Sequence, residues 1–122
     1  MRRFPVLIAA AATLALAGTA YAHPKLLSAT PAANATVAKP GRIELRFSEK
    51  LMPAFSKADL TMAAMPGMAA MKMASVAALG PDGRTLVITP SRPLPRGRYS
   101  VAWHVVSTDT HKVAGSYAFA VK

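Results

Sequence analysis

The sequence predicts an all-β protein, a small antiparallel β-sandwich that follows a cleaved signal peptide. Short runs of alternating apolar and polar residues are separated by Pro and Gly, and no long amphipathic helix pattern occurs. A chain of 122 residues has room for one domain. It contains no cysteine, which excludes disulfides, thiolate metal sites and a cysteine nucleophile.

The first 22 residues have the features of a signal peptide, which leaves residues 23–122 as the mature domain. Two arginines open the segment, an apolar run covers residues 6–17, and Ala20-Tyr21-Ala22 supplies the small residues of a cleavage site. We expect cleavage after Ala22, since the apolar run is too short to span a membrane. Loss of the two arginines lowers the net charge from +10 to +8. An exported protein of this charge is expected to meet acidic proteins or anionic lipid rather than nucleic acid.

Strand patterns recur through the mature domain. Every second residue is apolar in 43–47, 99–105 and 117–121, so each segment is expected to bury one face. Residues 86–88 are apolar and lie between the turn signal Asp82-Gly83 and Thr89-Pro90. In chain order, strands are expected at Leu26-Leu27, 43–47, around Leu60, around Val76, 86–88, 99–105 and 117–121.

The new N-terminus is the first of three features that could carry chemistry. After cleavage, His23 has a free α-amine beside its imidazole, and together they form a bidentate nitrogen chelate. Pro24 has no backbone N–H to lose, so its nitrogen cannot become a ligand. This nitrogen pair suits Cu(II) in a tetragonal field. The alternative is a frayed chain terminus without function.

The second feature is the segment Ser107-Thr108-Asp109-Thr110-His111. In an extended segment, Asp109 and His111 face the same side and can reach one ion together. With His23 they supply three nitrogens and a carboxylate oxygen, a set that favours Cu(II) and tolerates Ni(II) or Zn(II). The alternative is an Asp that hydrogen-bonds its own backbone in a turn beside a surface His.

The third feature is a methionine-rich segment in which five of twelve residues are Met: Met62, Met65, Met68, Met71 and Met73. Pro66-Gly67 interrupts the helical spacing, so the segment is expected to be a flexible loop between two strands. Thioethers are soft donors that suit Cu(I) and need no deprotonation to bind it. The alternative is methionine used as core filler or as an apolar protein-binding patch, and one or two of the five are expected in the core.

Other candidate residues carry weaker signals. Glu49 follows the 43–47 strand as either a surface charge or an additional oxygen ligand. His104 is expected to face solvent, and Trp103, the single Trp, to lie in the core. The sequence has no Ser-His-Asp arrangement, phosphate-binding loop or paired-carboxylate spacing, so hydrolysis and nucleotide chemistry are poor candidates. No enzymatic activity is expected.

Five motifs follow one another along residues 23–122: His23-Pro-Lys-Leu, Arg46-Phe-Ser-Glu49-Lys-Leu, Met65-Pro-Gly-Met68, Trp103-His-Val-Val-Ser-Thr-Asp109-Thr-His111 and Gly115-Ser-Tyr-Ala-Phe-Ala-Val. In this combination they closely resemble the CopC/PcoC family of periplasmic copper-binding proteins. The resemblance implies a seven-stranded Greek-key β-sandwich or barrel of the cupredoxin-like (Ig-like) type. It also implies two copper sites at opposite ends of the barrel, one for each oxidation state.

The resemblance also assigns individual residues to these two sites. His23, Asp109 and His111 match the family's Cu(II) ligands, and Glu49 matches a residue near that copper. Four methionines match the Cu(I) loop: Met62, Met65, Met68 and Met73. Known members carry a His in that loop where this chain has Ala70, so the Cu(I) site is expected to be all-thioether and to recruit Met71.

The function expected from these sites is that of a periplasmic copper carrier or buffer in copper resistance or supply. By resemblance, its partners are an inner-membrane copper transporter of the CopD type and a multicopper oxidase. Peripheral membrane contact fits the charge, and a monomer is expected. Two alternatives belong to other classes: a copper-dependent oxidative enzyme with an N-terminal His brace, and a metal-free adaptor with a Met-rich surface. The Met segment serves no purpose in the enzyme, and the domain is small for a substrate surface.

Overall fold

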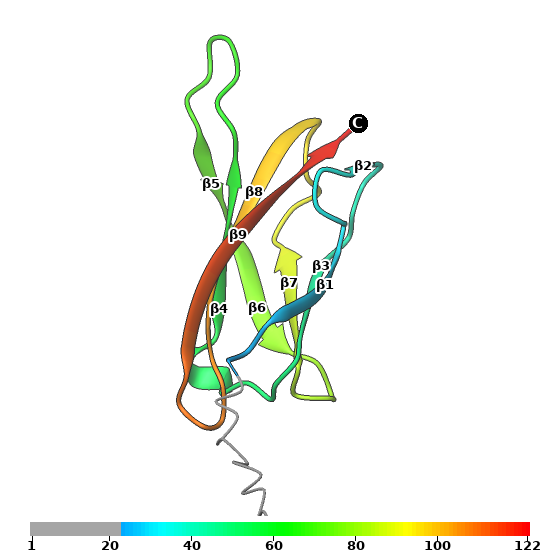
Figure 1. Ribbon diagram of the computed structural model, residues 1–122. Coiled ribbons are helices and arrows are strands. Elements are labelled where there is room, and N and C mark those ends of the chain that lie inside the picture. The colour runs from blue at the N-terminus through cyan, green and yellow to red at the C-terminus, as the bar shows by residue number, and fades with distance from the viewer. Residues whose placement is uncertain (1–22) are drawn as a thin grey trace, which may run out of the picture.

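Two β-sheets packed face to face make up the protein (Figure 1). The computed structural model describes residues 23–122, so the predicted signal peptide, residues 1–22, lies outside the described part. Within that part, the chain enters at one end of the sandwich and its C-terminus lies at the other (Figure 1). No helix in the described residues has the length and apolar character needed to cross a membrane.

The all-β prediction is confirmed, but residues 23–122 contain nine strands instead of seven. In chain order they are β1 (Leu26–Thr30), β2 (Thr36–Val37), β3 (Ile43–Phe47), β4 (Lys57–Met62), β5 (Met71–Met73), β6 (Ser75–Leu79), β7 (Thr85–Pro90), β8 (Gly97–Val106) and β9 (Lys112–Val121). The two additional strands are β2 and β5. A two-residue strand has no alternation to detect, and β5 lies inside the methionine-rich segment, which was expected to be a loop.

The strands are divided between a four-stranded sheet in the order β1-β3-β7-β6 and a five-stranded sheet in the order β2-β9-β8-β4-β5. Pairing is antiparallel throughout the described residues except between β2 and β9. Three hairpins connect sequential neighbours: β4–β5, β6–β7 and β8–β9. Because β4 and β8 run in opposite directions, the β4–β5 turn and the β8–β9 turn lie at opposite ends of the sandwich (Figure 1).

The core lies between the two sheets and follows the predicted alternation. In β8, the side chains of Tyr99, Val101, Trp103 and Val105 are buried, and those of the intervening residues are exposed. Trp103 packs edge-on against Phe47 of the opposite sheet, with 6.2 Å between ring centroids. The prediction that Trp103 lies in the core is confirmed, and so is the prediction that His104, on the other face of the strand, is exposed to solvent.

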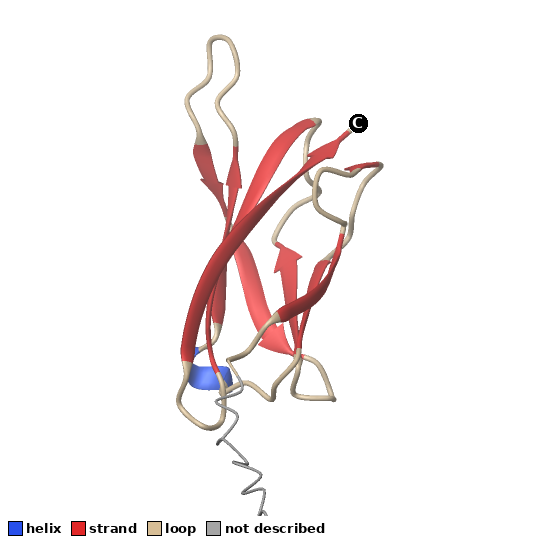
Figure 2. Ribbon diagram, viewed as in Figure 1, coloured by secondary structure: helices blue, strands red, loops and turns tan. Residues whose placement is uncertain are grey.

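One element in the described residues is helical, the single 3-10 turn η1 (Pro53–Phe55) that leads into β4 (Figure 2). Met52 precedes the turn in an extended conformation, and the proline begins it with no side-chain cap. The turn lies at the same end of the sandwich as the β8–β9 turn and the start of β1 (Figure 2). This end and the methionine-rich end carry all the candidate donor residues.

Candidate metal centres

His23 is held at the start of the sandwich by the residues that follow it. Pro24 is fully buried, and Lys25 exchanges two hydrogen bonds with Ser48. The N–H of Lys25 donates to Oγ of Ser48 at 2.9 Å, and the N–H of Ser48 donates to the carbonyl of Lys25 at 2.8 Å. The ring of His23 then packs edge-on against the ring of His111, with centroids 4.9 Å apart. The structure therefore brings together two of the predicted nitrogen donors from opposite ends of the sequence.

Residues 107–111 form a turn, so the prediction that this segment is extended is wrong. The N–H of Thr110 donates to the carbonyl of Ser107 at 2.8 Å, and Thr110 has a φ of 73°. Even so, Asp109 and His111 meet, because the turn folds the carboxylate back onto the ring. Oδ2 of Asp109 lies 3.0 Å from Nδ1 of His111.

The other carboxylate oxygen of Asp109 is held by Ser107, whose hydroxyl donates to Oδ1. This hydrogen bond, followed by the contact with His111, lowers the pKa of Asp109 from its ordinary value. The carboxylate is thus kept ionised and oriented beside the imidazole. Asp109 hydrogen-bonds within its own turn, as the turn interpretation of this segment requires, and its other oxygen contacts the imidazole of His111. Ser107 was not singled out in the sequence, although its buried hydroxyl orients the carboxylate.

Glu49 lies in a segment that contacts both the N-terminal residues and the β8–β9 turn. On one side Ser48 pairs with Lys25, and on the other the carbonyl of Lys50 accepts the N–H of Thr108 at 2.9 Å. Glu49 is half-buried between these two connections. The backbone therefore places it at the same end as His23 and His111. Among residues 23–122, however, no three His, Cys, Asp or Glu side chains converge closely enough to hold a metal ion as they stand. Binding there requires side chains to reorient.

The methionine-rich segment is a hairpin with a regular register rather than an unpaired loop. Met62 lies opposite Met71, and Met65 lies opposite Met68. Met65 and Met68 exchange backbone N–H···O bonds of 2.9 and 2.8 Å across the two-residue turn Pro66-Gly67. Gly67 has a φ of 81°, a conformation that glycine adopts at little cost. The hairpin extends beyond the rest of the sandwich (Figure 1).

The five methionines of this hairpin differ in burial. Met62 belongs to the core at 4% exposure, and Met65 and Met73 pack against the core. Met68 and Met71 are exposed at 46% and 47%. This confirms that some of these methionines fill the core. Residue pairing also places Met62, Met71 and Met73 on one face, because Met71 lies opposite Met62 and Met73 is two residues further along the same strand.

Gly97 leaves the space into which Met62 and Met65 fold. A Cβ atom on this glycine would lie 2.9 Å from Cε of Met62 and 3.8 Å from Sδ of Met65. The two side chains therefore lie over the same point of β8, at the base of the hairpin. Gly97 was not identified from the sequence, where nothing marks a glycine between two arginines as a contact for thioethers.

The arrangement as a whole is a β-sandwich with nitrogen and oxygen donors at one end and thioethers at the other. That combination defines a class of small β-sandwich proteins with two chemically distinct candidate metal centres. The comparisons with known proteins then place the chain: the CopC domain matches residues 26–122, and the protein belongs to the CopC family.

Two curated relatives are both called copper resistance protein C. The one from Xanthomonas campestris pv. juglandis is 53% identical over 114 residues, which cover 92% of this chain and 89% of the relative. The one from Pseudomonas syringae pv. tomato is 51% identical over 114 residues, 92% of this chain and 90% of that protein. Among solved structures, the methionine-rich copper resistance protein PcoC from Escherichia coli superposes with a TM-score of 0.77 at 48% identity. The match covers 83% of this chain and 100% of PcoC.

Proposed function

We propose that this protein is a periplasmic copper carrier or buffer, with a Cu(II) site at the mature N-terminus and a Cu(I) site on the methionine hairpin. The single observation that carries the proposal is the contact of His23 with His111 beside the carboxylate of Asp109. The names of its relatives support copper as the ion and resistance to copper as the setting. The predicted signal peptide supports the periplasm as the compartment.

The chemistry of the two ends favours different oxidation states of copper. The α-amine and imidazole of His23, the imidazole of His111 and the carboxylate of Asp109 form a donor set that suits Cu(II), and Glu49, at the same end of the sandwich, is the further oxygen donor that we propose. Thioethers suit Cu(I), and the exposed Met68 and Met71 are accessible to an incoming ion. A change in oxidation state therefore changes which end is preferred.

Exchange with partners follows from where the donors lie. A chain terminus, a turn and a projecting hairpin can reach another protein more easily than groups buried in a sheet. The partners that we propose are an inner-membrane copper transporter of the CopD type and a multicopper oxidase. We assign no reaction to the protein, because a carrier needs only binding and release.

The N-terminal site is tested by electron paramagnetic resonance of mature protein loaded with one equivalent of Cu(II). We expect a tetragonal spectrum with nitrogen couplings that is lost when Ala22 is retained, because His23 then has no free α-amine. His111→Ala should also weaken Cu(II) binding, and His104→Ala, which changes an exposed His on β8, is the matched control. Equal Cu(II) affinity with and without Ala22 would refute the amine as a ligand.

The hairpin site is tested by competition with a chromogenic Cu(I) chelator. Replacement of Met68 and Met71 by Leu should weaken Cu(I) binding and leave Cu(II) binding unchanged, because leucine keeps the apolar volume and removes the sulfur. Met52→Leu, which changes a methionine outside the hairpin, is the matched control. Unchanged Cu(I) affinity in the double variant would show that these methionines serve packing or protein contact.

A further inference from the structure

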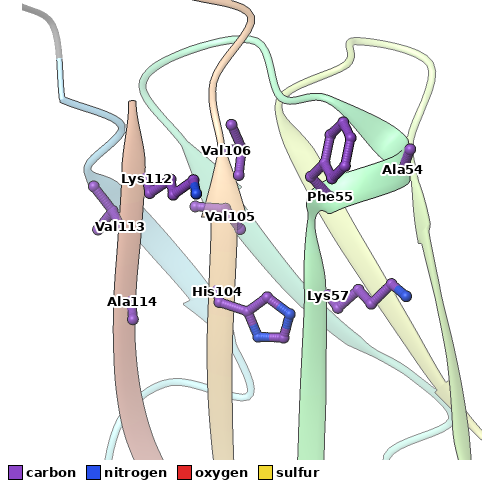
Figure 3. Close-up of a pocket in the computed structure, with 9 residues that line it drawn as sticks. All are labelled: Ala54, Phe55, Lys57, His104, Val105, Val106, Lys112, Val113 and Ala114. Carbon is purple, nitrogen blue, oxygen red and sulfur yellow. The ribbon is translucent and has the colours of Figure 1, made fainter. Parts of the chain in front are cut away.

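A hollow of about 450 Å³ lies on the outer face of the five-stranded sheet, away from the core. Its walls come from η1, β4, β8 and β9, and Figure 3 shows the side chains that surround it. The strand register explains why four of them, Lys57, His104, Val106 and Lys112, share the outer face. Lys57 of β4 lies opposite His104 of β8, and Val106 of β8 lies opposite Lys112 of β9. Their neighbours on β8, Trp103 and Val105, point into the core.

The charge around the hollow is of one sign. Lys57 and Lys112 line it beside His104, and none of its lining residues is Asp or Glu. The closest acidic residue along β4 is Asp59, whose carboxylate is paired with Lys72 at 2.9 Å and also interacts with His104; Lys72 first and His104 last lower its pKa. The closest on the β8–β9 turn is Asp109, which already contacts Ser107 and His111. Lys57 and Lys112 therefore have no carboxylate among the residues that line the hollow.

The hollow also has an apolar wall. Phe55 on η1 is 57% exposed, one of the few large apolar side chains in the described residues that face solvent. Val106 lies half-buried beside it on β8 (Figure 3). An exposed aromatic ring next to two lysines that form no ion pair within residues 23–122 is an arrangement found at protein-binding surfaces, where an apolar anchor and complementary charge act together.

We propose that this hollow binds an acidic segment of a partner protein, with carboxylates between Lys57 and Lys112 and an apolar side chain against Phe55. The concave shape favours a peptide segment over a lipid surface, because a bilayer is flat and is contacted by protruding groups. Lys112 directly follows His111. A partner bound here would therefore lie beside the proposed Cu(II) site, and this last point alone rests on the proposed function.

Binding is tested on copper-free, isotope-labelled mature protein by nuclear magnetic resonance. The probe is the peptide acetyl-Glu-Leu-Asp-Phe-Glu-amide, and its neutral counterpart, with Gln and Asn in place of the acids, is the control. We expect shifts at residues 54–57, 104–106 and 112–114 with the acidic peptide and none with the neutral one. Because no copper is present, the result does not depend on whether the proposed function is correct.

The variant Lys57→Glu/Lys112→Glu should weaken binding of the acidic peptide by about tenfold or more. The control Lys39→Glu/Lys122→Glu makes the same change in net charge at the far end of the sandwich and should bind as the wild type does. Equal loss in both variants would overturn the proposal in favour of unspecific attraction to a basic protein. It is also overturned by shifts elsewhere or by an affinity weaker than about 10 mM. Competition of the same resonances by phosphatidylglycerol vesicles would assign the hollow to lipid instead.

Discussion

Gly115 of β9 lies directly against the indole of Trp103, its partner across the β8–β9 pair. A Cβ atom on Gly115 would lie 2.5 Å from Cζ2, 2.8 Å from Cε2 and 3.2 Å from Cη2 of the ring. The substitution Gly115→Ala therefore forces the ring or the strand to move. The ring has little room, because Trp103 is 8% exposed and packs against Phe47 and Tyr117, both at 6.2 Å between centroids.

The magnitude follows from two opposing effects. Replacing glycine by alanine at a permissive backbone position stabilises a protein by about 0.4–1 kcal/mol, because the unfolded chain has fewer conformations. Overpacking of a core by one methyl group costs about 1–3 kcal/mol, and contacts below 3 Å to a rigid ring favour the upper part of that range. We expect a net loss of about 2 kcal/mol in the free energy of unfolding.

The assay is urea unfolding followed by the fluorescence of Trp103, the single Trp of the chain. Gly41→Ala is the matched control, because a Cβ at Gly41 meets nothing within 4 Å and its stability should change by less than about 1 kcal/mol. A free energy of unfolding for Gly115→Ala equal to that of Gly41→Ala would refute the reasoning. It would mean that the indole shifts freely.

Further predictions concern two tyrosines and the carboxylate beside His111. The hydroxyl of Tyr99 donates to a backbone carbonyl at 2.5 Å, so Tyr99→Phe should cost about 1 kcal/mol in urea unfolding. The buried hydroxyl of Tyr117 has no hydrogen-bond partner within residues 23–122, and burial raises its pKa to about 12, so Tyr117→Phe should be neutral or stabilising. A loss in the free energy of unfolding with Tyr117→Phe as large as that with Tyr99→Phe would contradict the difference expected between the two hydroxyls. Ser107→Ala should raise the pKa of Asp109 toward its ordinary value, as measured by carboxyl resonances during an acid titration. Because the pKa of Asp109 is depressed in the folded protein, the stabilising effect of this carboxylate is present above pH 3.8 and is lost as the pH falls further. A pKa of Asp109 that is unchanged by Ser107→Ala would refute the role of the hydroxyl.

The strands were predictable wherever one face is buried, since alternation records which side chains meet the core. For this reason β3 agrees with its predicted bounds of 43–47, and β8 buries the four residues that the pattern selects. The methionine hairpin was harder to predict because methionine suits both a core and an exposed loop. Its pairing depends on the partner strand β4 and on the turn Pro66-Gly67, which sequence spacing alone does not relate to each other.

The candidate Cu(II) residues make two contacts, His23 with His111 and Asp109 with His111, but the prediction of an extended backbone at residues 107–111 was wrong. Asp109 and His111 come together through a turn that Ser107 closes, not through the two-residue period of a strand. The contact of His23 with His111 joins positions far apart in the chain, and the residues that follow His23 are held by the burial of Pro24 and the pairing of β1 with β3. Such long-range placement is not contained in any local pattern.

The position of the two candidate centres at opposite ends of the sandwich has a kinetic consequence (Figure 1). The interior between them is filled mainly by aliphatic and aromatic side chains, which offer a copper ion no route from one end to the other. If copper occupies both ends as proposed, an ion that changes its oxidation state must leave the molecule before it is bound again at the other end. Relocation between the ends would then accelerate as the protein concentration rises, because a second molecule captures the released ion.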